Sequence, residues 1–86
     1  MAGTSTLTNP FASTSGSPLV TVTDSASVTV GTWVTYSGAS AVGGLTLNGS
    51  YEIINIVSGG YTIIAASNAT STATGGGTVT ATYQIN

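Results

Sequence analysis

Few residues in this chain could perform acid–base or nucleophilic chemistry. Asp24 and Glu52 are the only carboxylates, and the 86 residues include no Lys, Arg, His or Cys. Two carboxylates can hydrolyse a glycosidic bond when they lie about 5–10 Å apart. However, Asp24 stands at a predicted turn, where its side chain would bond to the local backbone, and Glu52 stands at a strand start and is expected to face water. We therefore assign both carboxylates structural roles.

Hydroxyl groups are abundant, but the sequence offers nothing to activate them. Ser and Thr together account for 29 of the 86 residues, whereas a hydroxyl nucleophile needs a basic partner such as His or Lys. Calcium takes roughly 6–8 oxygen ligands, usually with several carboxylates among them, so two carboxylates predict weak binding at best. The glycines at 75–77 lack the Lys and the following helix of a phosphate loop. The sequence predicts no enzyme, no cofactor and no metal.

The charge pattern also excludes two classes of partner. Nucleic-acid binding through phosphates requires Lys or Arg to release counterions, and neither is present. Attraction to an anionic membrane surface requires the same residues, and the longest apolar runs are far shorter than the ~20 residues that span a bilayer. We predict no nucleic-acid partner and no membrane partner.

The small size and the lack of charge both favour assembly. A chain this short buries only about 60% of its unfolded surface, and small scaffolds usually need a disulfide, a metal or a partner subunit. A chain without Cys or His cannot form a disulfide or hold a structural zinc ion. In addition, a formal net charge of −2 gives little electrostatic repulsion between copies. We therefore expect a homo-oligomer or a component of a larger particle.

The periodicity predicts an all-β fold. Residues 19–23 and 78–85 alternate between apolar and polar side chains, as half-buried strands do, and residues 51–57 are rich in β-branched side chains. Further strands are expected at 32–37 and 61–66, and Asn48-Gly49 is a strong hairpin signal. The result is a small antiparallel barrel or sandwich of five or six strands over residues 18–86, preceded by an extended N-terminal arm over residues 1–17.

The alternation also assigns the faces of these strands. The side chains expected inside are Val20, Val22, Val34, Ile54, Ile56, Ile63, Val79, Ala81, Tyr83 and Ile85. The assignment is ambiguous at Ile53-Ile54 and at Ile63-Ile64, where both faces are apolar, and we expect the arm or a neighbouring subunit to cover the second face. The arm itself carries one anchoring aromatic residue, Phe11, but has no partner within a five-stranded domain, so we expect neighbouring copies to order it.

Aromatic residues are the remaining candidates for a functional surface. Tyr and Trp on a β-surface serve as interface anchors or bind sugars, and in the core they pack across strands. All three interpretations stay open for most of them, although Trp33 and Tyr36 fall on opposite faces of one strand, so one of the two must point away from the core. The interface candidates are Phe11, Trp33, Tyr36, Tyr51 and Tyr61.

Several stretches in this order resemble a small β-barrel module of tailed-phage virion proteins, chiefly tail-associated ones. Such modules are often labelled by likeness, in fold and not in activity, to a domain of the ubiquitin-activating enzyme. The stretches are 9–12, 20–24, 30–39, 43–49 with 51–53, 61–63, 71–77 and 83–86. The chain departs from the pattern at Ser27-Val28, where the family usually has His-Gly, and at Thr32, where it usually has an acidic residue. The resemblance implies a small β-barrel inside a virion.

These observations favour a non-enzymatic structural protein of a tailed-phage virion, either a capsid decoration protein or a tail component. Its expected partners are copies of itself and other virion proteins, and its expected location is the virion, an extracellular particle. Two alternatives remain open. One is an adhesin-like or carbohydrate-binding surface module whose partner is a host-surface glycan, and the other is a subunit of a self-assembling extracellular β-filament in which the arm adds a strand to the next copy.

Overall fold

The computed structural model describes residues 2–25 and 28–84, and none of these residues is helical. Five strands match the predicted positions to within two residues. They are β3 (Leu19–Thr23), β4 (Trp33–Ser37), β5 (Gly49–Val57), β6 (Gly60–Ile64) and β8 (Thr78–Gln84). The prediction of an all-β antiparallel fold is therefore confirmed. Ile85, which the alternation placed inside, lies outside the described residues.

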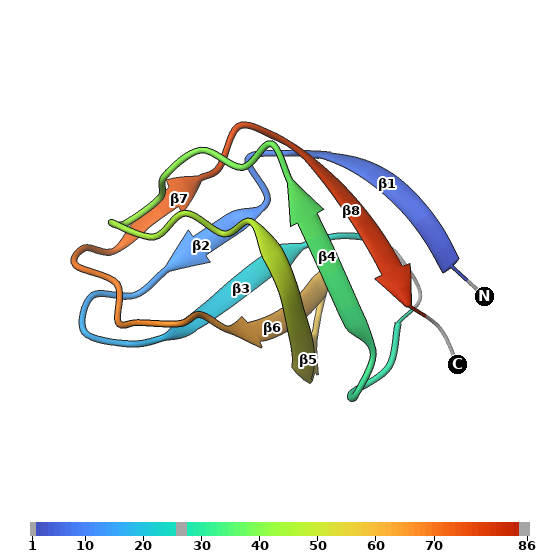
Figure 1. Ribbon diagram of the computed structural model, residues 1–86. Coiled ribbons are helices and arrows are strands. Elements are labelled where there is room, and N and C mark those ends of the chain that lie inside the picture. Colours follow the sequence, from blue (N-terminus) through green and yellow to red (C-terminus); the bar gives the residue numbers. More distant parts are fainter. Residues whose placement is uncertain (1, 26–27, 85–86) are drawn as a thin grey trace.

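The strand number is larger than predicted, because Thr-rich and Gly-rich segments also form strands. These are β1 (Ala2–Thr8), β2 (Phe11–Ser13) and β7 (Ala73–Gly75). The fold is thus an eight-stranded, nearly closed barrel rather than one of five or six strands (Figure 1). The expectation that the N-terminal segment has no partner within its own domain is also wrong, since β1 pairs with β8, and β2 pairs with β3 and β7.

All strand pairs are antiparallel, and their order is β1-β8-β4-β5-β6-β3-β2-β7. The β1–β8 ladder continues as the β2–β7 ladder around a corner formed by two loops. At this corner the Asn9 backbone N–H donates to the Gly77 carbonyl (2.8 Å), and the Gly77 N–H donates back to Asn9 Oδ1 (3.0 Å). Asn9 has a φ of +46°, a left-handed conformation that Asn tolerates through its short polar side chain. The corner lets one long strand pair serve both halves of the barrel.

The barrel interior is filled by side chains that alternate along the strands. Those of β3 and β8 that were predicted inside are buried, as are Val34 and Ile63. Phe11 and Tyr36 meet edge to face with ring centroids 5.0 Å apart, a favoured aromatic geometry. The buried apolar side chains, beginning from the N-terminus, are Phe11, Val20, Val22, Val34, Tyr36, Val42, Leu45, Leu47, Ile53, Tyr61, Ile63, Ala65, Ala69, Val79, Ala81 and Tyr83.

The predicted facing of β5 is wrong, and a register shift explains the error. Ile53 is fully buried opposite Ile63, whereas Ile54 is half-buried and Ile56 is 45% exposed. The ladder between β5 and β6 shifts between Ile53 and Asn55, and an extra residue of this kind breaks the alternation on which the prediction depended. Ile56 lies one residue before the end of β5, next to the turn to β6.

The tight turn between β4 and β5 lies at Gly43-Gly44 rather than at Asn48-Gly49. Val42 and Leu45 exchange two backbone hydrogen bonds across it, at 2.7 and 2.9 Å, and both glycines have positive φ, as a two-residue turn of this type requires. The loop 38–48 folds back on itself by this turn and buries Val42 and Leu45. Asn48 instead lies at the base of the loop.

Candidate functional site

Asp24 is a buried acid at one end of the barrel. It directly follows β3, and it continues the inward alternation of Val20 and Val22, so its side chain points into the barrel and is only 5% exposed. Its backbone N–H donates to the Gly59 carbonyl (3.1 Å) in the turn between β5 and β6. The sequence predicted Asp24 at a turn with its side chain bonded to the local backbone, whereas its side chain lies in the core and accepts hydrogen bonds from tyrosines.

Three tyrosine hydroxyls connect to this carboxylate. Tyr61 donates to Asp24 Oδ2 at 2.9 Å, and Tyr83 donates to the same oxygen. Tyr36 and Tyr61 hydroxyl oxygens are 2.8 Å apart, and since the proton of Tyr61 is directed at Asp24, Tyr36 is the donor of that pair. We call Asp24, Tyr36, Tyr61 and Tyr83 the Asp–Tyr cluster. It joins β4, β6 and β8 to the end of β3.

Burial dominates the electrostatics of the Asp–Tyr cluster. Burial, together with the hydrogen bond to Asp24, raises the pKa of Tyr83 to about 12. Burial also raises the pKa values of Tyr36 and Tyr61 well above the ordinary tyrosine value. All three hydroxyls therefore stay protonated and act as donors across the physiological pH range. In a low-dielectric interior such a connected network fixes the relative positions of the strands that supply it.

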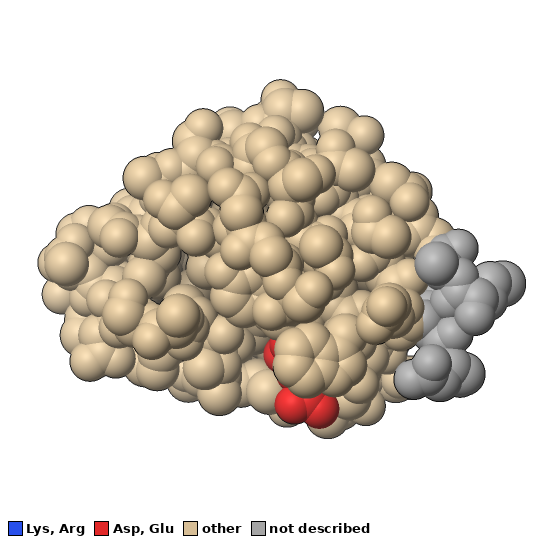
Figure 2. Space-filling model, in the orientation of Figure 1, with Lys and Arg blue, Asp and Glu red and all other residues tan. Residues whose placement is uncertain are grey.

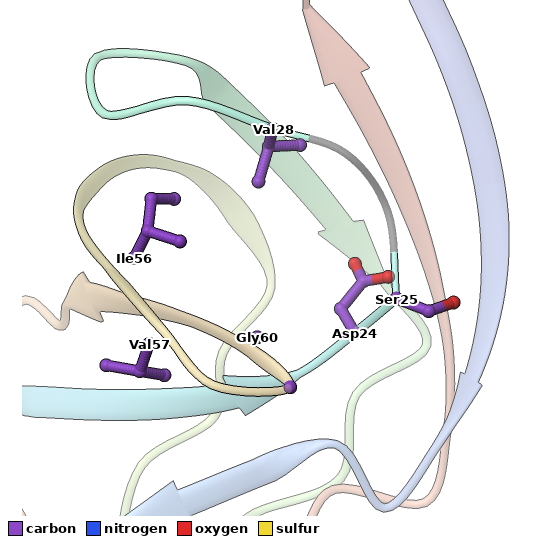
Figure 3. A pocket seen from close by; sticks show the side chains of 7 residues that line it. Asp24, Ser25, Val28, Ile56, Val57 and Gly60 are labelled. Carbon is purple, nitrogen blue, oxygen red and sulfur yellow. The ribbon is translucent and has the colours of Figure 1, made fainter.

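A surface hollow of about 370 Å³ adjoins Asp24 at this end of the barrel. Figure 3 shows Asp24 on one side of it, with Val28 and Ile56 across from the carboxylate. Gly60 packs so tightly against β3 that an added Cβ would lie 1.8 Å from the Val22 carbonyl oxygen. The hollow is open to solvent, and its walls mix polar and apolar surface. The lining residues are Asp24, Ser25, Val28, Ile56, Val57, Gly59 and Gly60.

The structure separates the aromatic interface candidates by their burial. Phe11, Tyr36 and Tyr61 are at most 1% exposed and belong to the core. Tyr51 is half-buried against the core, and its ring centroid lies 5.9 Å from that of Tyr36. Trp33 is 45% exposed, which confirms that one of the pair Trp33 and Tyr36 points away from the core.

The two carboxylates lie in different environments. Glu52 is exposed on β5, where its register partner on β4 is Trp33, whereas Asp24 is buried among tyrosines. Figure 2 shows a face almost without charge, with the acidic atoms confined to a small area at one edge. Within residues 2–25 and 28–84, no three His, Cys, Asp or Glu side chains come together as a metal site would require.

Sequence reasoning missed the Asp–Tyr cluster, although part of the signal was available. The alternation of Val20 and Val22 continues to Asp24, and the alternation of β8 places Tyr83 inside. What it could not show was that the ends of β3 and β8 meet, because they are 59 residues apart in the chain. Among the described residues, no buried side-chain nitrogen or oxygen lacks a hydrogen-bond partner.

The described part of the chain contains no helix long and apolar enough to cross a membrane. No protein-family model matches the sequence, and no curated protein matches it at a significant level.

Proposed function

We propose that this protein is a non-enzymatic structural subunit that acts by pairing with further copies of itself. The observation that carries the proposal is the edge formed by β1. This strand stands at one end of the strand order and, among the described strands, pairs only with β8. Its seven residues include no charged residue and no proline. Edge strands of monomeric proteins are usually protected by such residues or kept short.

The other end of the strand order differs in length. β7 has three residues, so it offers a much shorter row of backbone groups than β1. Length and lack of protection therefore favour β1 as the contact surface between subunits. A strand added there would gain main-chain hydrogen bonds without removing any charge from water.

The sequence of β1 is suited to pairing with a second β1 about a two-fold axis. With the axis at Ser5, Thr4 of one copy faces Thr6 of the other, and Gly3 faces Leu7. Thr–Thr cross-strand pairs are favourable, and Gly3 leaves space beside the Leu7 side chain. A two-fold contact of this kind uses the same surface on both subunits, so it closes as a dimer.

Uncovered apolar residues on the outside of the barrel give further support. Leu19 and Ile64 are register partners on β3 and β6, and they are 45% and 49% exposed. An adjacent apolar pair on the outer face of a sheet is suited to contact with a second protein surface. This pair supplies a second contact beyond the dimer, as a component of a larger particle needs.

We place this subunit in the virion of a tailed phage, as a capsid decoration protein or a tail component. The support for this location is the resemblance of the sequence to β-barrel modules of tail-associated virion proteins. Imaging of the native particle tests it directly. Density for this barrel in regular copies on a tailed-phage particle is expected, and its absence from such particles would overturn the location without touching the proposed self-pairing.

Sedimentation analysis tests the pairing. The double variant T4K/T6K places two lysines directly opposite each other across the two-fold axis, where like charges are destabilising. The matched control, T21K/T23K, adds the same charge at the same spacing on β3, whose two exposed threonines lie on a strand paired on both sides.

The native chain and the control are expected to sediment as dimers, and T4K/T6K as a monomer. A native chain that stays monomeric at high micromolar concentration would refute the proposal. Open-ended growth instead of a closed dimer would refute the two-fold geometry and favour pairing of β1 with β7.

A further inference from the structure

The Asn48 side chain fastens the base of the loop that joins β4 to β5. Its Oδ1 accepts a hydrogen bond from the Ala39 backbone N–H at 2.9 Å, and its Nδ2 donates to the Ala39 carbonyl at 3.3 Å. The Tyr51 hydroxyl donates to the Asn48 backbone carbonyl at 3.1 Å. We call the two contacts between Asn48 and Ala39 the amide clasp. It is exposed to water, so only these few hydrogen bonds hold it.

The backbone at Gly49 leaves room for its nitrogen to react with the Asn48 side chain. Gly49 is exposed, has a φ of +103°, and would have no atom within 4 Å of an added Cβ. Because glycine has no side chain, residue 49 presents no steric hindrance to the approach of its backbone nitrogen to the Asn48 side-chain carbonyl carbon. Gly49 is also in the last register pair of the β4–β5 ladder, opposite Tyr36, where local opening of a ladder is easiest.

We propose that Asn48 is a site of spontaneous deamidation, controlled by opening of the amide clasp. The Gly49 backbone nitrogen forms a bond to Asn48 Cγ, the bond from Cγ to Nδ2 breaks, and the nitrogen leaves as ammonia with the proton from the Gly49 amide. Water then opens the resulting five-membered imide at either carbonyl and leaves aspartate or isoaspartate at position 48. No oxidant, reductant or cofactor takes part.

The product cannot restore the amide clasp. A carboxylate at position 48 still accepts from the Ala39 N–H, but it has no proton to donate and it repels the Ala39 carbonyl oxygen. Isoaspartate also lengthens the backbone by one atom immediately before β5. Either product adds one negative charge to a chain whose formal net charge is −2. The modification is therefore a one-way release of the base of the loop 38–48, where Asn48 meets Ala39.

The other asparagines in the described residues are less reactive for reasons visible in the structure. Asn9 precedes Pro10, which has no N–H to lose. Asn55 precedes Ile56 within β5, and a β-branched neighbour hinders the approach. Asn68 precedes Ala69, whose backbone N–H already donates to the Ser17 carbonyl at 2.9 Å.

Peptide mass mapping of the intact protein, aged at mildly alkaline pH and body temperature, tests the proposal. The mass increase of amide hydrolysis is expected first in the peptide that contains Asn48. The rate is expected to be roughly ten-fold lower than in the urea-unfolded chain, which corresponds to ~1.4 kcal/mol of clasp opening. Modification at another asparagine first, equal rates in the two states, or no reaction in the folded protein once the unfolded chain has converted would each overturn it.

Two variants separate the clasp from general stability. Y51F removes one hydrogen bond to Asn48 and is expected to raise the rate severalfold, with the urea midpoint nearly unchanged. N48D imitates the aspartate product, and hydrogen exchange in this variant is expected to be faster at the base of the loop 38–48, while β3 and β8 stay as protected as in the native chain. Unchanged exchange in the loop would show that the amide clasp does not hold it.

Discussion

Replacing Asp24 with alanine removes the acceptor from two tyrosine hydroxyls at once. Tyr61 and Tyr83 both donate to Asp24 Oδ2, and both side chains are at most 4% exposed. Both hydroxyls lie beside a carboxylate that is itself only 5% exposed. The variant therefore tests whether the hydrogen bonds of the Asp–Tyr cluster stabilise the fold.

The expected loss in the free energy of unfolding follows from the two hydroxyl donors that lose their acceptor. A buried donor left without an acceptor costs about 1–3 kcal/mol, so two of them cost about 2–6 kcal/mol. Removing a buried carboxylate returns part of this, because its own desolvation is relieved. We expect D24A to lower the free energy of unfolding by about 3 kcal/mol. For 86 residues the total is about 4–13 kcal/mol, so the loss is large but measurable.

Urea unfolding followed by far-ultraviolet circular dichroism measures this loss, provided that the slope with denaturant stays constant. D24N keeps one acceptor oxygen and should lose only about 1–2 kcal/mol, which makes it the variant of choice if D24A does not fold. E52Q is the matched control, because Glu52 is exposed and its replacement should change stability by less than about 0.5 kcal/mol.

A double-mutant cycle with Y83F isolates the contact itself. Alone, Y83F should cost about 1.5 kcal/mol, and its effect should largely vanish in the D24A background because the two residues are in contact. If D24A is as stable as E52Q, or if the effects of D24A and Y83F simply add, the structural role assigned to the Asp–Tyr cluster is wrong.

Three further predictions concern pH and packing. The pKa of Tyr83 is about 12 in the fold, whereas the pKa of tyrosine in an unfolded chain is about 10. The stability that Tyr83 contributes should therefore be fully present below pH ~10 and be lost as the pH rises through ~12. Urea midpoints measured across this pH range will show the loss. G60A places a Cβ 1.8 Å from a β3 backbone oxygen and should lower the free energy of unfolding by about 3 kcal/mol or more. In G59A the added Cβ meets no atom within 4 Å, so this variant should lose only about 1 kcal/mol, because of the positive φ. Equal losses of stability in a calorimetric comparison would contradict this prediction. I53A should cost about 2–5 kcal/mol and I56A less than half as much, and the reverse order in urea unfolding would place the register shift elsewhere.

The alternating segments were predictable because their burial pattern is local. In β3 and β8 every second side chain is apolar and buried, so a period of two reveals both the strand and its inner face. In β5 the apolar run Ile53-Ile54 fits either face, and the register shift beside it decided in favour of Ile53. A register shift depends on how the partner strand lies, which is not written in the segment itself.

The strands β1, β2 and β7 show the opposite case. Their Thr, Ser, Ala and Gly residues have little apolar periodicity, and Phe11 alone suggested an anchor. They become strands because backbone groups from distant parts of the chain lie ready to pair with them, as in the ladder between β1 and β8. Tertiary pairing here outweighs local preference, which is weak for strands and depends on context.

By itself, the sequence determined that this protein is all-β, that its polar surface is made of hydroxyl groups rather than charges, and which side chains of β3 and β8 point into the core. These properties follow from composition and from a period of two, and both are local. Only the tertiary structure decided that the N-terminal segment completes the barrel, that Asp24 joins three tyrosines, and that Asn48 fastens a loop instead of forming a turn. Each of these depends on contacts between residues far apart in the chain or on the exact path of a loop, and such contacts exist only once the barrel has formed.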